Sequence, residues 1–165
     1  MEILNIKEKE VHAEVTFKSP CSGLISKWEI YILVLNEGIV ELDMSGKQLR
    51  TIDLGNNQDG ILYITATKDG IYCIDCTENK VYCNSMTGEN IWTFTNKSLV
   101  NVRGISVDGD QNVFVVGRVS KNMMVIQHDG KVSKMLLTES DGLINSWSIH
   151  FDKDKKLLLI CCGEN

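Results

Sequence analysis

Three stretches that align without gaps decide the fold of this chain: LDMSGKQLRTI (residues 42–52), CNSMTGENIWTF (83–94) and IQHDGKVSKMLL (126–137). They place Gly46, Gly88 and Gly130 at intervals of 42 residues, and each glycine follows a small polar residue. Small polar residues followed by glycine supply the positive φ that a tight hairpin turn needs. A fixed interval of this length indicates a repeat architecture.

Each turn lies between two runs in which apolar and polar residues alternate, which is the pattern of β-strands. A second pair of such runs lies upstream, as in ILYITATKDGIYCIDC (61–76) and GISVDGDQNVFVVG (104–117). Each repeat therefore holds about four short strands, and a repeat of roughly 40–45 residues with four strands is typical of a β-propeller blade. We expect an all-β chain, with a β-sandwich of coincidental spacing as the alternative.

The repeat divides the chain into blades of four strands. Complete blades are predicted at residues 21–54, 60–95 and 102–138, with the two outer strands of an earlier blade at 1–18 and the two inner strands of a last blade at 146–162. About four blades' worth of strands are thus present. The two half-blades would close a four-bladed ring if they joined, whereas the favoured alternative is a fragment of a six-bladed propeller.

The start of the third predicted blade, VRGISVDGDQNVFVVG (102–117), resembles an NHL repeat. The family pattern runs Pro-x-Gly-Ile-x-Val-Asp, then a turn with glycine or asparagine, then a Val-Tyr-Val strand. Val102 replaces the usual proline, and Gly117 stands near where an aspartate commonly closes the repeat. The matching residues are Arg103, Gly104, Ile105, Val107, Asp108, Asn112, Val113, Phe114 and Val115.

Residues 60–160 also resemble the C-terminal propellers of tripartite-motif (TRIM) proteins, particularly those of invertebrates, through phrases such as YCNSMTGENIWTF and VIQHDGK. In that family the ubiquitin-ligase chemistry belongs to an N-terminal RING finger, and no closely spaced Cys and His residues in this sequence could hold its two zinc ions. The resemblance implies a non-catalytic module that recruits a protein substrate for the ligase. RNA recognition by the same module is a variant of this interpretation.

The composition and charge of the chain limit the classes of partner that it could bind. The chain has 165 residues, is 43% hydrophobic and carries a net charge of −5, so nothing in it favours DNA or a membrane surface as a partner. The first ten residues are charged and lack an apolar run, so we expect no secretory signal and a cytoplasmic location. In a reducing compartment the six cysteines are expected to be free thiols.

A propeller enzyme, either a quinoprotein-type oxidoreductase or a calcium-dependent lactonase or hydrolase, is the alternative function. Thr87-Gly88-x-x-x-Trp92 is similar to the docking motif of quinoprotein propellers, but Arg50 and Lys134 stand in place of the tryptophan in the other repeats. We therefore expect Trp92 to be a packing residue of an outer strand, and we predict no cofactor.

The sequence provides no convincing catalytic or metal site. Cys73-x-x-Cys76 lies within a predicted strand, where residues three apart point to opposite faces. Asp108 and Asp152 each end the first strand of a blade, where an aspartate usually accepts hydrogen bonds from turn amides, although calcium ligation is the functional alternative. No Gly-x-Ser-x-Gly elbow supports a nucleophile.

Binding residues are sought in the loops on one face of the propeller, because a rigid scaffold commonly presents functional loops. These loops are Asn36–Gly38, Gly55–Gly60, Thr77–Lys80, Asn96–Arg103, Arg118–Asn122 and Thr138–Trp147. Their basic and acidic residues are equal in number, which favours a protein partner over a phosphate backbone. The predicted partner-binding residues are Lys97, Arg103, Arg118, Lys121 and Trp147.

Overall fold

The computed structural model describes residues 2–5, 10–26, 30–55 and 60–163, with side chains for residues 14–25, 30–55 and 60–163. Three antiparallel sheets of four strands make up most of it, and strands that are consecutive in sequence are neighbours in each sheet. The first sheet holds β3 (Cys21–Ser26), β4 (Ile30–Val34), β5 (Gly38–Leu42) and β6 (Gln48–Ile52). The second holds β7 (Ile61–Ala66), β8 (Ile71–Asp75), β9 (Lys80–Asn84) and β10 (Asn90–Thr95). The third holds β11 (Val102–Val107), β12 (Val113–Gly117), β13 (Asn122–Ile126) and β14 (Ser133–Leu137).

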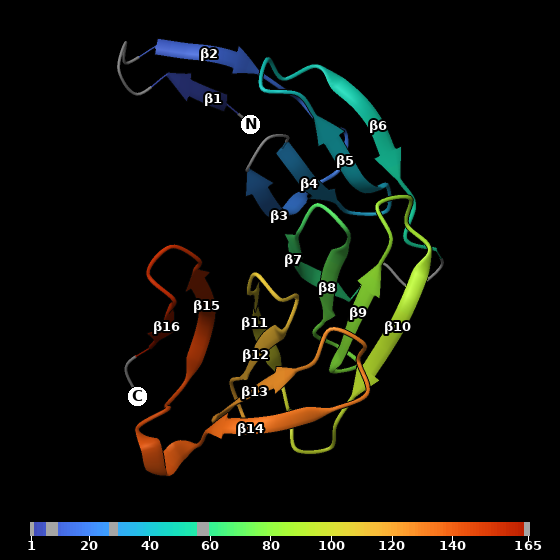
Figure 1. Ribbon diagram of the computed structural model, residues 1–165. Helices are drawn as coiled ribbons and strands as arrows, with labels where there is room; N and C mark the ends of the chain where they lie inside the picture. Colours follow the sequence, from blue (N-terminus) through green and yellow to red (C-terminus); the bar gives the residue numbers. More distant parts are fainter. Residues whose placement is uncertain (1, 6–9, 27–29, 56–59, 164–165) are drawn as a thin grey trace.

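The sheets follow one another around an arc, with their first strands on the inner side and their last strands on the outer side (Figure 1). Strand β7 contacts both β3 and β11, and β11 contacts β15 (Ser146–Asp152), so the first strands of successive sheets are side by side. Sheets of four antiparallel strands arranged in this way are the blades of a β-propeller. The predicted fold class is confirmed.

The two half-blades stay separate. Strand β1 (Glu2–Asn5) pairs with β2 (Glu10–Glu14), and β15 pairs with β16 (Leu157–Cys162), in two sheets of two strands each. A short 3₁₀ helix, Glu139–Asp141, lies in the loop that leads to β15. No described strand of one pair bonds to the other pair, so the four-bladed ring that the two half-blades could close by joining is not formed among the described strands.

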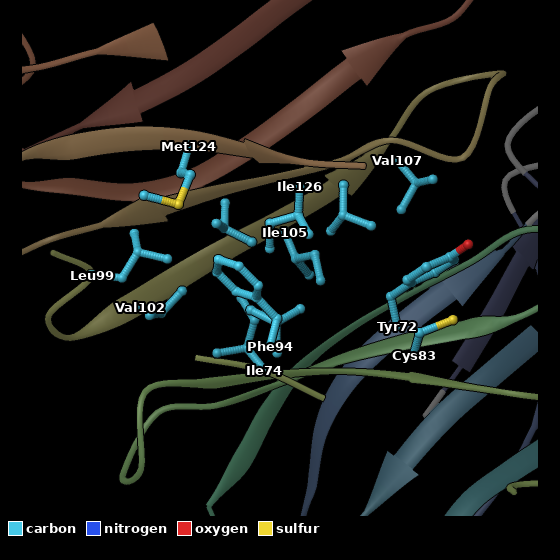
Figure 2. Close-up of a cluster of buried hydrophobic side chains, with 13 residues drawn as sticks. Tyr72, Ile74, Cys83, Phe94, Leu99, Val102, Ile105, Val107, Met124 and Ile126 are labelled. Atoms are coloured by element: carbon cyan, nitrogen blue, oxygen red, sulfur yellow. The ribbon is translucent and has the colours of Figure 1, made fainter. Parts of the chain in front are cut away.

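Apolar side chains between neighbouring blades form the core. Between the second and third blades, side chains from β8–β10 pack against those of β11–β13 (Figure 2). The alternation seen in the sequence explains this arrangement, since each strand sends every second side chain toward one neighbouring blade. The labelled members of the cluster are Tyr72, Ile74, Cys83, Phe94, Leu99, Val102, Ile105, Val107, Met124 and Ile126.

Trp92 joins these two blades at their outer strands. Its indole Nε1 donates a hydrogen bond of 2.9 Å to the carbonyl of His128, and its ring lies against Gly130 in the turn of the next blade. The centroids of its ring and of Tyr72 are 6.2 Å apart. Trp92 is therefore a packing residue, as the sequence predicted.

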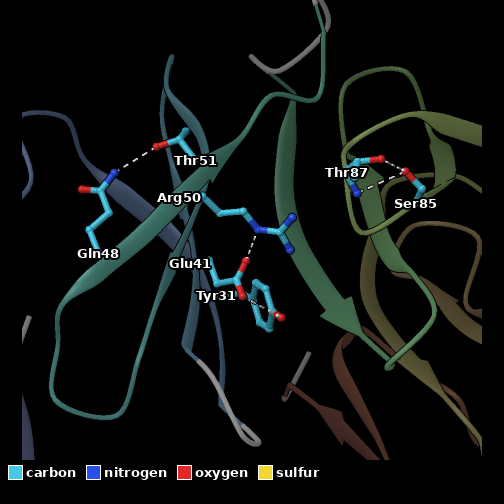
Figure 3. A network of polar contacts seen from close by, with 7 residues as sticks. All are labelled: Tyr31, Glu41, Gln48, Arg50, Thr51, Ser85 and Thr87. Atoms are coloured by element: carbon cyan, nitrogen blue, oxygen red, sulfur yellow. Dashed lines mark hydrogen bonds and ion pairs between the residues drawn. The ribbon is translucent and has the colours of Figure 1, made fainter.

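The position equivalent to Trp92 holds a charge in the first blade. Arg50 is paired across the strands with Glu41, whose carboxylate is buried and forms an ion pair with the arginine Nε (Figure 3). The hydroxyl of Tyr31 donates a hydrogen bond of 3.5 Å to the same carboxylate. In the third blade Lys134 takes this position, so the tryptophan docking contact does not recur from blade to blade.

The repeated turns have the backbone that the sequence predicts. Gly46, Gly88 and Gly130 take φ values of 84°, 95° and 72°, a region of backbone conformation that residues with a Cβ atom rarely adopt. The first turn of the third blade places its positive φ on a residue other than glycine. In the turn between β11 and β12, the positive φ of 64° belongs to Gln111 and not to Gly109, so the glycine there is not required by the backbone.

Candidate functional site

Each blade begins with a β-bulge. The pairing of its first and second strands shifts by one residue, so Ser22, Leu62, Arg103 and Trp147 are each an extra residue without a partner across the strands. A bulge turns its side chain away from the regular alternation, and bulges are common next to functional sites. Arg103 and Trp147 therefore occupy equivalent positions in consecutive blades.

A repeated hydrogen bond fixes the neighbouring loop. The residue after each second strand donates its N–H to the carbonyl that precedes the first strand of the same blade, as from Arg118 to Asn101 (3.0 Å) and from Cys76 to Gly60 (2.9 Å). Arg118 and Cys76 are thus also equivalent positions. Each lies beside the bulge residue of the next blade, Trp147 for Arg118 and Arg103 for Cys76.

Two arginines share the indole ring of Trp147. The Cζ atom of Arg118 lies 3.7 Å from the ring centroid, and the Cζ atom of Arg103 lies 5.9 Å from it. Both distances are within the range of a cation–π interaction, which stabilises a charge that remains partly solvated by about 0.5–1 kcal/mol. The indole is 38% exposed and the arginines are half-buried, so the stack can be reached from solvent.

Asparagines hold both guanidinium groups in place. The Nε atom of Arg118 donates to Oδ1 of Asn145 at 2.6 Å, and that of Arg103 donates to Oδ1 of Asn101 at 2.7 Å. Both asparagines have positive φ, 47° and 57°, which asparagine tolerates better than most residues. Because Nε is the atom used in each case, neither asparagine contact occupies the terminal nitrogens, and the guanidinium of Arg103 also contacts the thiol of Cys76.

The five predicted site residues divide into three situations. Arg103, Arg118 and Trp147 come together as described. Lys121 forms an ion pair with Glu139 of the next loop, which neutralises its charge locally. Lys97 lies elsewhere, in a hollow beside the loop between β8 and β9, together with Glu78, Asn79, Thr95, Asn96, Leu99 and Val100.

Exposed apolar side chains come from the same loops as the stack. Val100 is 40% exposed, Val119 62% and Ile144 37%. The N–H of Val119 donates to the carbonyl of Val100 at 3.2 Å, so these two lie side by side. We call the two arginines, Trp147 and these three residues the loop-face cluster.

Sequence reasoning missed the asparagines and the bulges. Asn101 and Asn145 stand at the same place in their blades, one residue before the first strand, as do Pro20 and Gly60. An alignment of the repeats on the first strand, rather than on the glycine turn, would have shown this. Of the predicted loops, residues 56–59 lie outside the described part of the chain.

The two cysteines of Cys73-x-x-Cys76 lie in different surroundings. Cys73 is fully buried, whereas Cys76 is half-buried beside Arg103. Burial raises the pKa of the Cys76 thiol, and the charge of Arg103 opposes that rise. Within the described ranges, no three His, Cys, Asp or Glu side chains lie close enough together to hold a metal ion.

The opposite face carries the turns between first and second strands. Asp108 accepts hydrogen bonds from the N–H groups of Asp110 (2.9 Å) and Asn112 (2.8 Å), and Asp152 accepts two of 3.0 Å from the turn that follows it. These aspartates therefore hold their turns, which is the structural role that the sequence suggested. A shallow pocket nearby is lined by residues that include Ser106, His150 and Asp152.

The four-stranded antiparallel sheets that follow one another around an arc define a β-propeller. Solved structures share this fold at low sequence identity. Virginiamycin B lyase from Staphylococcus aureus is 17% identical with a TM-score of 0.67, and the match covers 88% of this chain and 50% of the lyase. A computationally designed protein is 11% identical with a TM-score of 0.62, covering 93% and 99%. A WD40 domain from Neurospora crassa is 19% identical with a TM-score of 0.58, covering 80% and 41%.

These matches show the fold alone. The chain spans about half the length of the lyase structures that it matches. No protein family matches the sequence, and no curated protein matches it either. In the described part of the chain, no helix has the length and apolar character needed to cross a membrane.

Proposed function

We propose that this chain is a non-catalytic binding module, the propeller that recruits a protein substrate for a TRIM-like ubiquitin ligase. The ligase chemistry would come from a RING finger, which is not among these residues. The protein partner binds the loop-face cluster. A propeller enzyme of the calcium-dependent lactonase or quinoprotein class is the alternative.

The stack of Arg118 and Arg103 on Trp147 carries this proposal. Arginine and tryptophan are the residues that most often dominate binding energy at protein interfaces. Here the asparagine contacts fix the arginines before a partner arrives, which reduces the entropy lost on binding. The exposed valines and isoleucine beside the stack supply the apolar contact area that a protein partner needs.

The charges on this face favour a protein over RNA. Lys80 and Lys121 are neutralised by Glu78 and Glu139, and the loops as a whole are electrically balanced. Single-stranded RNA is usually bound along a clearly basic groove, with bases stacked on aromatic rings. In the loop-face cluster the ring of Trp147 is already engaged by a guanidinium.

The test is affinity capture from cell extract with quantitative mass spectrometry. We compare the wild-type chain with Trp147→Ala and with a matched control, Lys134→Gln, which changes an exposed residue of the outer strand β14. A defined set of proteins should be retained by the wild type and the control and lost with Trp147→Ala. Treating the extract with ribonuclease should leave that set unchanged.

Recruitment for ubiquitination makes a second demand on the captured proteins. Their ubiquitination in cells should fall when the Trp147→Ala chain replaces the wild type within its full-length protein. Proteins that are captured equally by all three chains would contradict a role for this face. Loss of the captured set after ribonuclease treatment would assign the face to RNA instead.

A further inference from the structure

We infer that the loop-face cluster recognises a carboxylate, and that its partner presents an aspartate or glutamate side chain flanked by aliphatic residues in an extended segment. This inference rests on the proposed function and names the chemistry of the partner. It follows from three observations on the same face: the absence of an ion-pair partner for either arginine among the described residues, the Nε contacts that hold both arginines, and the exposed apolar residues of the same loops.

Within the described part of the chain, the two arginines have no acidic partner. Among the described residues, neither Arg103 nor Arg118 forms an ion pair, although the chain carries 22 acidic residues against 17 basic ones. Half-buried cations are costly when they stay unpaired, and the indole ring offsets only part of that cost. An anion that binds here would therefore interact with both guanidinium groups at once.

The geometry favours a carboxylate in particular. Each guanidinium uses Nε to hold its asparagine, and this contact leaves the terminal nitrogens of Arg118 for a planar acceptor, while the guanidinium of Arg103 also contacts the thiol of Cys76. Guanidinium and carboxylate groups match in a bidentate arrangement, and such charge-assisted hydrogen bonds are about twice as strong as neutral ones. The net charge of −5 does not prevent the approach of an acidic segment, because salt at physiological strength screens charges beyond about 8 Å.

The apolar neighbours determine what flanks the carboxylate. Val119 directly follows Arg118, and Val100 lies three residues before Arg103. Ile144 directly precedes Asn145, the asparagine that holds Arg118. The repeated phosphates of a nucleic acid would place charges against these three apolar side chains, which would gain nothing from the contact. An acidic residue with aliphatic neighbours would bury their exposed area while its carboxylate meets the arginines.

Selection from a phage library of random dodecapeptides on the wild-type chain tests the inference. The enriched peptides should carry Asp or Glu within two residues of Leu, Ile or Val. Synthetic fluorescein-labelled versions of them are then titrated by fluorescence anisotropy. Replacing the acidic residue by its amide should weaken binding by about tenfold or more, the loss expected when a charged hydrogen-bond partner is removed.

Two protein variants separate charge from geometry. Arg118→Lys keeps the positive charge but loses the planar fork and the stack on Trp147, so the acidic peptide should bind it about tenfold more weakly. Lys134→Gln should bind like the wild type. Urea unfolding of each variant confirms that it is folded before it is titrated.

The possible failures point to different conclusions. Enriched peptides that lack acidic residues but lose binding with Trp147→Ala would overturn this inference and leave the proposed function intact. A phosphoserine peptide that binds more than tenfold tighter than its aspartate counterpart would overturn it in favour of phosphate. If no peptide is enriched and a labelled oligouridine binds, both the inference and the protein-binding proposal fall.

Discussion

At the scale of single residues, the buried thiol of Cys73 links stability to pH. Burial raises its pKa to about 12 from an ordinary value of 9.0. Between these values the unfolded chain releases a proton that the folded chain keeps. The stability contributed by this group is therefore complete below pH 9 and is lost as the pH rises toward 12, by up to about 1.4 kcal/mol per pH unit.

We expect the urea midpoint of the wild type to fall between pH 8 and pH 10, and to fall less in Cys73→Ala. The variant is less stable at both pH values because it leaves a small cavity, so the comparison is made on the difference between them. Burial also raises the pKa of Tyr72, whose ordinary value is 10.0, and for that reason the series stops at pH 10. If the urea midpoint falls equally in both proteins, Cys73 ionises as freely in the folded chain as in the unfolded chain.

Replacing Trp92 and replacing Trp147 should have different effects on the free energy of unfolding. Trp92→Phe removes the hydrogen bond to His128 and part of the ring that covers Gly130, and should lower the free energy of unfolding by about 1–2 kcal/mol. Trp147→Phe keeps an aromatic ring at an exposed position and should change it by less than about 0.5 kcal/mol. Urea unfolding of both variants measures the contrast, and equal losses would mean that Trp92 does not join the blades.

At the scale of elements, the close approach of inner strands depends on Gly104. A Cβ atom there would lie 2.8 Å from the backbone nitrogen of Ile149 and 2.9 Å from the Cα atom of Ser148, both on strand β15. Gly104→Ala must therefore push β15 away from β11, and should cost about 1–3 kcal/mol in the free energy of unfolding. Gly109→Ala is the matched control, because nothing lies within 4 Å of the added atom.

Fluorescence gives this prediction a second readout. Displacement of β15 would move Trp147 relative to Arg118, so the tryptophan emission of Gly104→Ala should differ from that of the wild type while Gly109→Ala keeps the native spectrum. Stability and emission that are both unchanged in Gly104→Ala would contradict the packing of β11 against β15.

The same elements show how far the sequence alone could lead. Turn glycines and strand alternation are local, so Gly46, Gly88 and Gly130 predicted the propeller fold class correctly. The bulge at Arg103 and Trp147 depends on how two strands pair, which no single strand reveals. The pairing of Lys121 with Glu139 depends on loops from different blades, and so the sequence grouped this lysine with Arg103 and Arg118 although its charge is neutralised.

At the scale of the whole molecule, the edge strand β16 is where we expect contact with another chain. Among the described strands, β16 pairs only with β15, and it exposes 53% of Leu157 and 58% of Leu159. An exposed strand edge that also carries apolar side chains is a template for pairing with another chain. A complete blade has two more strands beyond such an edge. Among the described strands, β1 and β2 pair only with each other and do not cover β16.

We therefore expect the chain to associate as its concentration rises, and Leu159→Lys to suppress that association by placing a charge on the edge. Val132→Lys is the control, since Val132 is 52% exposed in the turn before β14 and lies away from this edge. Sedimentation velocity over a concentration series measures the result. If both lysine variants associate like the wild type, contacts elsewhere hold the chains together, because a lysine on an edge strand hinders pairing there but leaves distant surfaces unchanged.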